Sequence, residues 1–185
     1  MIVLNTMADP YAAPDSDALF EVVNGTRVEK PMGLTEQVLG GDLHGYLVAY
    51  ARLSGHGRAV VETMFAIPGS GNDRKPDLAF VAYDTWPKDR RIPRTNAWAV
   101  APDLAVEVVS PSDAAFDVVA KVHEYFAGGV KQVWLVWSHV EHVYVFESST
   151  TVRVLTRADT LTSESLLPGF QLPLIELFPH YDESP

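Results

Sequence analysis

Residues 102–137 read PDLAVEVVSPSDAAFDVVAKVHEYFAGGVKQVWLVW, and this stretch decides the fold class. Its two ends, Leu104–Val109 and Gln132–Trp137, are short apolar runs typical of buried strands. Between them we expect a helix that ends before Gly128-Gly129, a pair suited to the left-handed close of a helix. Strand, helix and strand in succession indicate an α/β protein with one sheet flanked by helices.

Sequence patterns on either side of this stretch predict the remaining elements. Asn24-Gly25 lies between two apolar runs and predicts a tight β-hairpin, because such a turn needs positive φ. Residues 1–17 are polar and punctuated by proline and aspartate, so we expect a loose N-terminal leader ahead of a single domain over residues 18–185. The expected fold is a mixed β-sheet flanked by helices, with this N-terminal hairpin. Further segments expected are a helix over 35–53, strands over 59–67, 78–83, 142–147 and 151–156, and a tail over 166–178 that packs on an edge of the sheet.

The composition excludes several classes of protein. The 185 residues contain no cysteine, which removes disulfide scaffolds, cysteine zinc sites and thiol catalysis. No apolar run approaches the roughly 18 residues of a membrane span, and the first residues lack the pattern of a secretion signal. We therefore expect a cytoplasmic protein with no membrane partner. A net charge of −10 argues against a DNA-coating protein, but not against an enzyme with a local basic patch and a metal.

Two carboxylates mark the candidate active site. Glu107 lies inside an apolar strand, where a carboxylate loses hydration and must be paired, protonated or bound to a cation. Asp77 precedes another apolar strand, and we expect the two strands to be adjacent and parallel, which would bring both acids to one end of the sheet. With the backbone carbonyl of Val108 they form a hard oxygen site suited to Mg²⁺, with Mn²⁺ as a substitute. Lys121, in the following helix, could orient water or stabilise charge on a phosphorus atom.

This ordered combination resembles the PD-(D/E)XK nuclease superfamily, and within it the bacterial family of restriction-endonuclease-like domains expanded in cyanobacteria. The resemblance covers most of the chain. It implies a restriction-endonuclease-like fold, with a mixed β-sheet flanked by helices. It also implies a Mg²⁺-dependent endodeoxyribonuclease in which Asp77 and Glu107 bind metal, Lys121 acts in catalysis and DNA is the substrate. The segments that carry it are LFEVVNG, KPDLAFV, PDLAVEVVSPSD, DVVAKVHEYFAGGVKQVWLVW and LLPGFQLPLIELF.

Some positions depart from the superfamily pattern. Val109 stands where the superfamily has its lysine, two residues after the glutamate, and Lys121 resembles a lysine that has migrated to the next helix. The residues four positions on either side of it, Asp117 and Tyr125, match a recurring Asp and Tyr and are assigned supporting roles. In the first helix, Glu36 matches an acid that often joins the metal site. Next to it, Gln37 stands where this family usually has histidine.

A basic stretch lies beside the two acids, with six of the fourteen Lys and Arg residues between positions 74 and 94. Arginine suits phosphate contacts, so part of this stretch is a candidate DNA-binding rim, and a solvated loop is an equal alternative. Trp86 and Trp98 are expected to anchor the loop to the core rather than stack on bases. The candidate substrate-binding residues are Arg74, Lys75, Arg90 and Arg91.

Two other functions are compatible with these residues. The first is a catalytically inactive binding or regulatory module with the same fold, motivated by Val109, Gln37 and the acidic net charge. The second is a metal-free hydrolase, such as a glycosidase, that uses Asp77 and Glu107 as acid and base. Because cutting both strands of a duplex requires two sites, a homodimer is a reasonable expectation for the nuclease.

Overall fold

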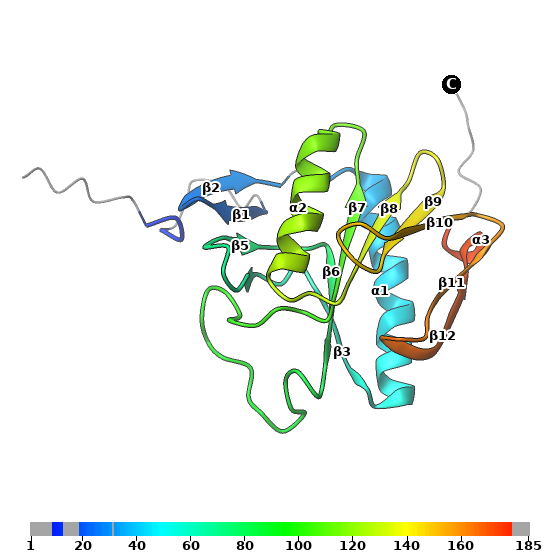
Figure 1. Cartoon of the computed structure of the whole chain (residues 1–185), viewed down its shortest axis with the longest axis horizontal. Helices are drawn as coiled ribbons and strands as arrows, with labels where there is room; N and C mark the ends of the chain where they lie inside the picture. The colour runs from blue at the N-terminus through cyan, green and yellow to red at the C-terminus, as the bar shows by residue number, and fades with distance from the viewer. Residues whose placement is uncertain (1–8, 13–18, 31, 179–185) are drawn as a thin grey trace, which may run out of the picture.

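The computed structural model describes residues 9–12, 19–30 and 32–178, and at its centre lies a six-stranded sheet (Figure 1). Two of its strands are parallel, with helix α2 (Ala115–Ala127) as the crossover between them, and the other neighbouring pairs are antiparallel. The sheet is therefore mixed, as predicted. In spatial order its strands are β10 (Val152–Thr156), β9 (His142–Phe146), β8 (Gln132–Trp137), β7 (Leu104–Val109), β6 (Leu78–Ala82) and β3 (Gly57–Val61), of which β7 and β8 are the parallel pair.

Side chains alternate between the two faces of the sheet, and each face has its own apolar core. On one face, Leu78 packs with α1 (Leu34–Ser54), whose Leu43 is fully buried. On the other face, Ala79 packs with α2 through Tyr125. Figure 1 shows α2 in front of the sheet and α1 behind it. Complete burial of each large apolar side chain stabilises the fold by about 1.5–3 kcal/mol, so both helices are firmly attached.

A second, smaller sheet carries the N-terminal hairpin and lies beside α2 (Figure 1). The predicted hairpin turn is confirmed, since Asn24 and Gly25 have φ values of 51° and 73°. Because a strand of this sheet comes directly before β6 in the chain, the hairpin is held next to Asp77. In spatial order the strands are β2 (Thr26–Glu29), β1 (Phe20–Val23), β5 (Asp73–Arg74) and β4 (Phe65–Ala66).

The expectation that the strands of Asp77 and Glu107 run parallel is wrong. β6 and β7 are antiparallel, with Leu78 opposite Val106. The connection over residues 83–103 leaves β6 and enters β7 at the same end of the sheet, whereas a parallel pair needs a crossover to the opposite end. The two acids nevertheless meet, because each lies one position beyond the Leu78–Val106 pair.

Two other segments differ from their predicted form. The strand expected over 59–67 is interrupted at Glu62, whose φ of 46° turns the chain out of the β conformation before the short β4. The tail expected on a sheet edge forms β12 (Leu167–Pro173) and α3 (Leu174–Leu177). β12 pairs with β11 (Thr160–Ser163), and the tail packs into the core on the α1 face of the sheet.

Most of the expected leader lies outside the described residues. Within it, the Tyr11 hydroxyl donates a hydrogen bond to the Asp73 carboxylate, and the Tyr11 ring packs edge-on against Phe20. This part of the leader therefore contacts the hairpin sheet. Among the described helices, none is long and apolar enough to cross a membrane.

Candidate active site

The register of β6 and β7 brings the two predicted acids together. Asp77 immediately precedes β6 and Glu107 lies within β7, on the sheet face covered by α2. Both are buried, with 3% and 6% of their surface exposed. Two carboxylates at such depth require compensating positive charge or protons.

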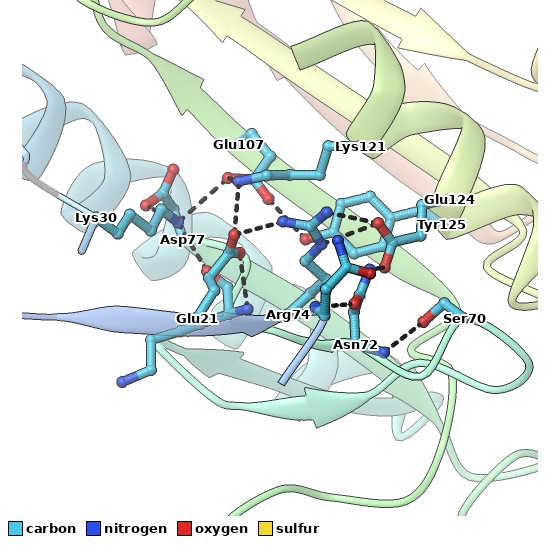
Figure 2. Close-up of polar contacts among 12 residues, drawn as sticks. Glu21, Lys30, Ser70, Asn72, Arg74, Asp77, Glu107, Lys121, Glu124 and Tyr125 are labelled. Atoms are coloured by element: carbon cyan, nitrogen blue, oxygen red, sulfur yellow. Dashed lines mark hydrogen bonds and ion pairs between the residues drawn. The ribbon is translucent and has the colours of Figure 1, made fainter. Parts of the chain in front are cut away.

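An unpredicted lysine supplies much of that charge. The Lys30 ammonium lies 2.7 Å from Asp77 Oδ1 and 3.2 Å from Glu107 Oε2, and it donates a hydrogen bond of 2.7 Å to the Lys75 carbonyl. Lys30 directly follows β2, so the N-terminal hairpin delivers this cation to the acids (Figure 2). In the sequence, a lysine after a hairpin strand has no feature that separates it from a surface residue.

The α2 helix adds the lysine and the tyrosine that the sequence predicted. Lys121 Nζ lies 3.5 Å from Glu107 Oε2 and 3.4 Å from Glu21 Oε2. One helical turn further on, the Tyr125 hydroxyl donates a hydrogen bond of 2.6 Å to Glu107 Oε1. The predicted supporting residue Asp117 is exposed at the rim, while the ion pairs of Lys121 go to the two glutamates.

Fixed donors hold one oxygen of each acid. The backbone N–H of Val108 donates to Asp77 Oδ2 at 2.7 Å, just as Tyr125 donates to Glu107 Oε1. The other oxygen of Asp77, Oδ1, has no donor among the described residues apart from the Lys30 ammonium. Each carboxylate therefore has one anchored oxygen and one oxygen directed at a shared cation position.

A second ion-pair network anchors this site to three elements. The Arg74 guanidinium, from β5, contacts Glu21 Oε2 of β1 at 2.9 Å and Glu124 Oε2 of α2 at 2.5 Å. Glu21 also accepts the backbone N–H of Lys75 at 3.0 Å. Arg74, predicted as a DNA contact, is thus held between two carboxylates (Figure 2). Glu21 was not predicted, although a lone acid in the apolar run FEVV is the same signal that marked Glu107.

The surroundings of the two acids shift their pKa values in opposite directions. Burial and the negative charge of Glu107 raise the pKa of Asp77 above its ordinary value, against the influence of Lys30. Burial acts in the same direction on Glu107, but the charges of Lys121 and Lys30 and the hydrogen bond from Tyr125 outweigh it and lower the pKa of Glu107. Burial opposes the charge on Lys30, yet both acids hold its pKa above the ordinary range, so it is an ammonium at neutral pH.

Glu62 is a further unpredicted acid next to the site. It directly follows β3, and its backbone N–H donates to the carbonyl of Asp77 at 3.1 Å. Burial, together with the negative charges of Asp77 and Glu107, raises the pKa of Glu62 to about 7, against the opposing charges of Lys30 and Lys75. In the sequence Glu62 directly follows an apolar run, whereas Asp77 directly precedes one, and either position is also ordinary for a surface acid at a strand end.

A cavity of about 560 Å³ opens beside these residues, between the hairpin and α2. Both acids, Lys30 and Lys121 line it, and so does the predicted Glu36 of α1. Glu36 accepts a hydrogen bond of 3.0 Å from the Ser138 hydroxyl and joins neither ion-pair network of the described residues. Val108 also lines the cavity, and the metal-binding roles of Glu36 and of the Val108 carbonyl stay predictions.

The remaining predicted basic residues lie elsewhere. The backbone of Lys75 contacts the site, because its carbonyl accepts from Lys30 and its N–H donates to Glu21. Its ammonium lies 5.5 Å from the centre of the Phe20 ring. The Arg90 guanidinium stacks at 3.7 Å over the ring of Trp86, and Arg91 is exposed in the same loop. This loop leaves β6 at the end opposite Asp77, and neither arginine lines the cavity. Trp86 and Trp98 are buried and in edge-to-face contact, which fits the expected anchoring of the loop.

The donor set at the shared cation position fits a divalent metal. Asp77 Oδ1, Glu107 Oε2 and the Lys75 carbonyl already surround one positive charge, and all are hard oxygen ligands. Within the described ranges, no three His, Cys, Asp or Glu side chains gather as a metal cluster. Mg²⁺ suits such a sparse set, because it keeps several of its waters and takes few protein ligands.

The mixed sheet, the crossover helix and the paired acids define a restriction-endonuclease-like protein. The chain belongs to the Uma2 family, described as putative restriction endonuclease, whose family model matches residues 8–175. A solved structure with the same fold is that of a putative nuclease from Anabaena variabilis, which is 18% identical and has a TM-score of 0.77. The alignment covers 90% of this chain and 93% of that one. No curated protein sequence matches the chain.

Proposed function

We propose that the protein is a Mg²⁺-dependent endodeoxyribonuclease that hydrolyses phosphodiester bonds in DNA. The observation that carries this proposal is the pair Asp77 and Glu107, each with one oxygen fixed by a donor and the other directed at a common cation position. Membership of a family described as putative restriction endonuclease supports the same activity. The cavity beside the acids gives a phosphate group access to them.

Each residue has a distinct role in this proposal. Asp77 and Glu107 would hold the metal, which when bound polarises the phosphate and lowers the pKa of its water. Tyr125 fixes the orientation of Glu107 through its hydroxyl donor. Lys121, 3.5 Å from Glu107 Oε2, places a positive charge where negative charge develops on the phosphate oxygens. Arg74 holds the hairpin and α2 in place around the site.

The test is cleavage of supercoiled plasmid DNA in Mg²⁺ by Asp77→Asn and Glu107→Gln variants. Loss of either metal ligand should lower the rate roughly 100-fold or more, because both the electrostatic and the water-activating contributions depend on it. Asp84→Asn is the matched control, since Asp84 is an exposed acid at the other end of β6 and should leave the rate unchanged. Wild-type rates for the Asp77 and Glu107 variants would refute the assignment.

One observation favours the alternative of a catalytically inactive binding module. The cation position between the acids is filled by Lys30 of the same chain, which satisfies both carboxylates without a metal. Calorimetry separates the two functions: a nuclease should give Mg²⁺ or Mn²⁺ binding heat at millimolar concentration that disappears in Asp77→Asn. An inactive module should give none.

A further inference from the structure

The oxygens that suit a divalent cation are the same ones that hold the Lys30 ammonium. Asp77 Oδ1 at 2.7 Å and Glu107 Oε2 at 3.2 Å are the free oxygens of the two proposed metal ligands, and the Lys75 carbonyl at 2.7 Å completes the group. A divalent ion bound by the same oxygens would be in direct contact with the ammonium, and two positive charges in contact in a buried site repel each other strongly. Lys30 and the metal therefore cannot occupy the position together.

The Lys30 side chain also has room to move away from the two carboxylates. Its four-carbon side chain is flexible, and 14% of it is exposed, so it lies at the wall of the site rather than in the core. The cavity of about 560 Å³ that it lines provides space for the ammonium next to the acids. Glu29 and Glu36, which line the same cavity, offer negative charge to receive it. Movement of one side chain would open the cation position without unfolding the hairpin.

We propose that Lys30 is a built-in counter-cation that competes with the divalent metal for Asp77 and Glu107, and that metal binding displaces its ammonium into the adjoining cavity. This inference rests on the proposed metal-dependent function. The role of Lys30 belongs to the metal-free protein, in which the ammonium neutralises two mutually repelling carboxylates. Its displacement moves a positive charge toward the side from which a DNA phosphate would approach.

The first test is calorimetric titration of Mn²⁺ into wild-type protein and Lys30→Met at pH 8. The variant should bind Mn²⁺ roughly tenfold more tightly, the change expected when a competing charge-assisted contact of ordinary strength is removed. Lys88→Met removes the same charge from an exposed position in the loop after β6, and it should match the wild type. If the wild type binds and Lys30→Met binds no more tightly, the displacement is wrong while the metal site stands. If neither protein binds, both proposals fail.

The second test uses the wild-type protein, so it does not depend on the folding of a variant. Lysines are acetylated briefly with and without Mn²⁺, and the modification at each lysine is measured by peptide mass spectrometry. Displacement should raise the modification of Lys30 several-fold, because a paired, largely buried ammonium reacts slowly. Lys88 serves as the internal control and should react equally in both samples. Unchanged or reduced modification of Lys30 in saturating Mn²⁺ would overturn the inference.

Discussion

At the scale of single residues, the site depends on which oxygen of each carboxylate is already satisfied. The sequence could predict Glu107, because an acid inside an apolar strand must have a specific partner. It could not predict that Lys30 would be that partner, since the contact forms only when the hairpin docks beside β6 and β7. The same holds for Glu21, whose partner Arg74 is distant in sequence. Local patterns identify the buried charges, and tertiary packing decides how they pair.

Tyr125→Phe should weaken both the fold and the metal site. The Tyr125 hydroxyl donates to Glu107 Oε1 at 2.6 Å, and its loss leaves a buried carboxylate oxygen without a donor. We expect a loss of about 1–3 kcal/mol in the free energy of unfolding, together with a higher pKa for Glu107 and weaker Mn²⁺ binding. Urea denaturation and calorimetry measure these effects. Tyr50→Phe, which removes an exposed hydrogen bond to the Pro168 carbonyl, should change each of them little.

Glu62→Gln should change how stability depends on pH. The folded protein holds the Glu62 proton with a pKa of about 7, above the ordinary value near 4.5, so the folded state binds more protons between these values. Stability contributed by the protonated form is therefore lost as pH rises from about 4.5 to 7, and glutamine does not undergo this loss. At pH 8 the variant should be more stable by about 1 kcal/mol, allowing for solvent screening of a half-buried group.

Urea denaturation of the wild type and Glu62→Gln at pH 5, 6, 7 and 8 checks this expectation. Only the difference between the two proteins is compared, because Asp77 and Glu107 titrate in both. The difference should grow with pH and level off above pH 7. Parallel stability profiles would show that Glu62 does not titrate near neutrality.

At the scale of elements, the bounds of single strands and turns could be predicted from the sequence, whereas the relative direction of paired strands could not. The bounds of β7 and β8 were predicted to the residue, and the hairpin turn at Asn24-Gly25 was confirmed, because short apolar runs and turn residues carry their own information. The direction of β6 relative to β7 was predicted wrongly, because it depends on the course of the connection over 83–103. The tail over 166–178 covers a face of the sheet instead of an edge, since its apolar residues fit the core around α1.

Arg74→Met should loosen the attachment of the hairpin to α2. The guanidinium bridges Glu21 and Glu124, whose side chains are only 6% and 15% exposed, so methionine leaves two largely buried charges without their main partner. We expect a loss of about 2–4 kcal/mol in the free energy of unfolding, with Lys121 and backbone donors partly compensating Glu21. Faster hydrogen exchange should be concentrated in β1, β2 and β5.

The matched control for this change is Arg153→Met. Arg153 pairs with Glu147 at 2.9 Å, but both side chains are well exposed, at 40% and 46%. Exposed ion pairs contribute about 0–1 kcal/mol, so the control should lose far less stability. Equal losses in the two variants would mean that the Arg74 network does not hold the hairpin.

At the scale of the whole molecule, an acidic chain with a net charge of −10 gathers three partly buried cations at one place. Lys30, Arg74 and Lys121 come from the hairpin, the small sheet and α2, and all three point at carboxylates on or beside the central sheet. The site therefore exists only when the two sheets and the crossover helix are assembled. Any ligand that binds between Asp77 and Glu107 should stabilise the entire fold.

Divalent metal should accordingly raise the melting temperature, and the effect should depend on pH. A metal at 100 times its Kd adds about 2.7 kcal/mol to the free energy of unfolding, or roughly 5–10 °C for a domain of this size. The metal binds the ionised form of Asp77, whose pKa lies above its ordinary value, so protonation competes with binding as pH falls. The shift should be largest at pH 8, decline toward pH 5 and be absent in Asp77→Asn. Asp84→Asn should retain the shift, because this variant keeps both acids of the site. If the metal instead bound non-specifically to the acidic surface, the shift would persist in both variants.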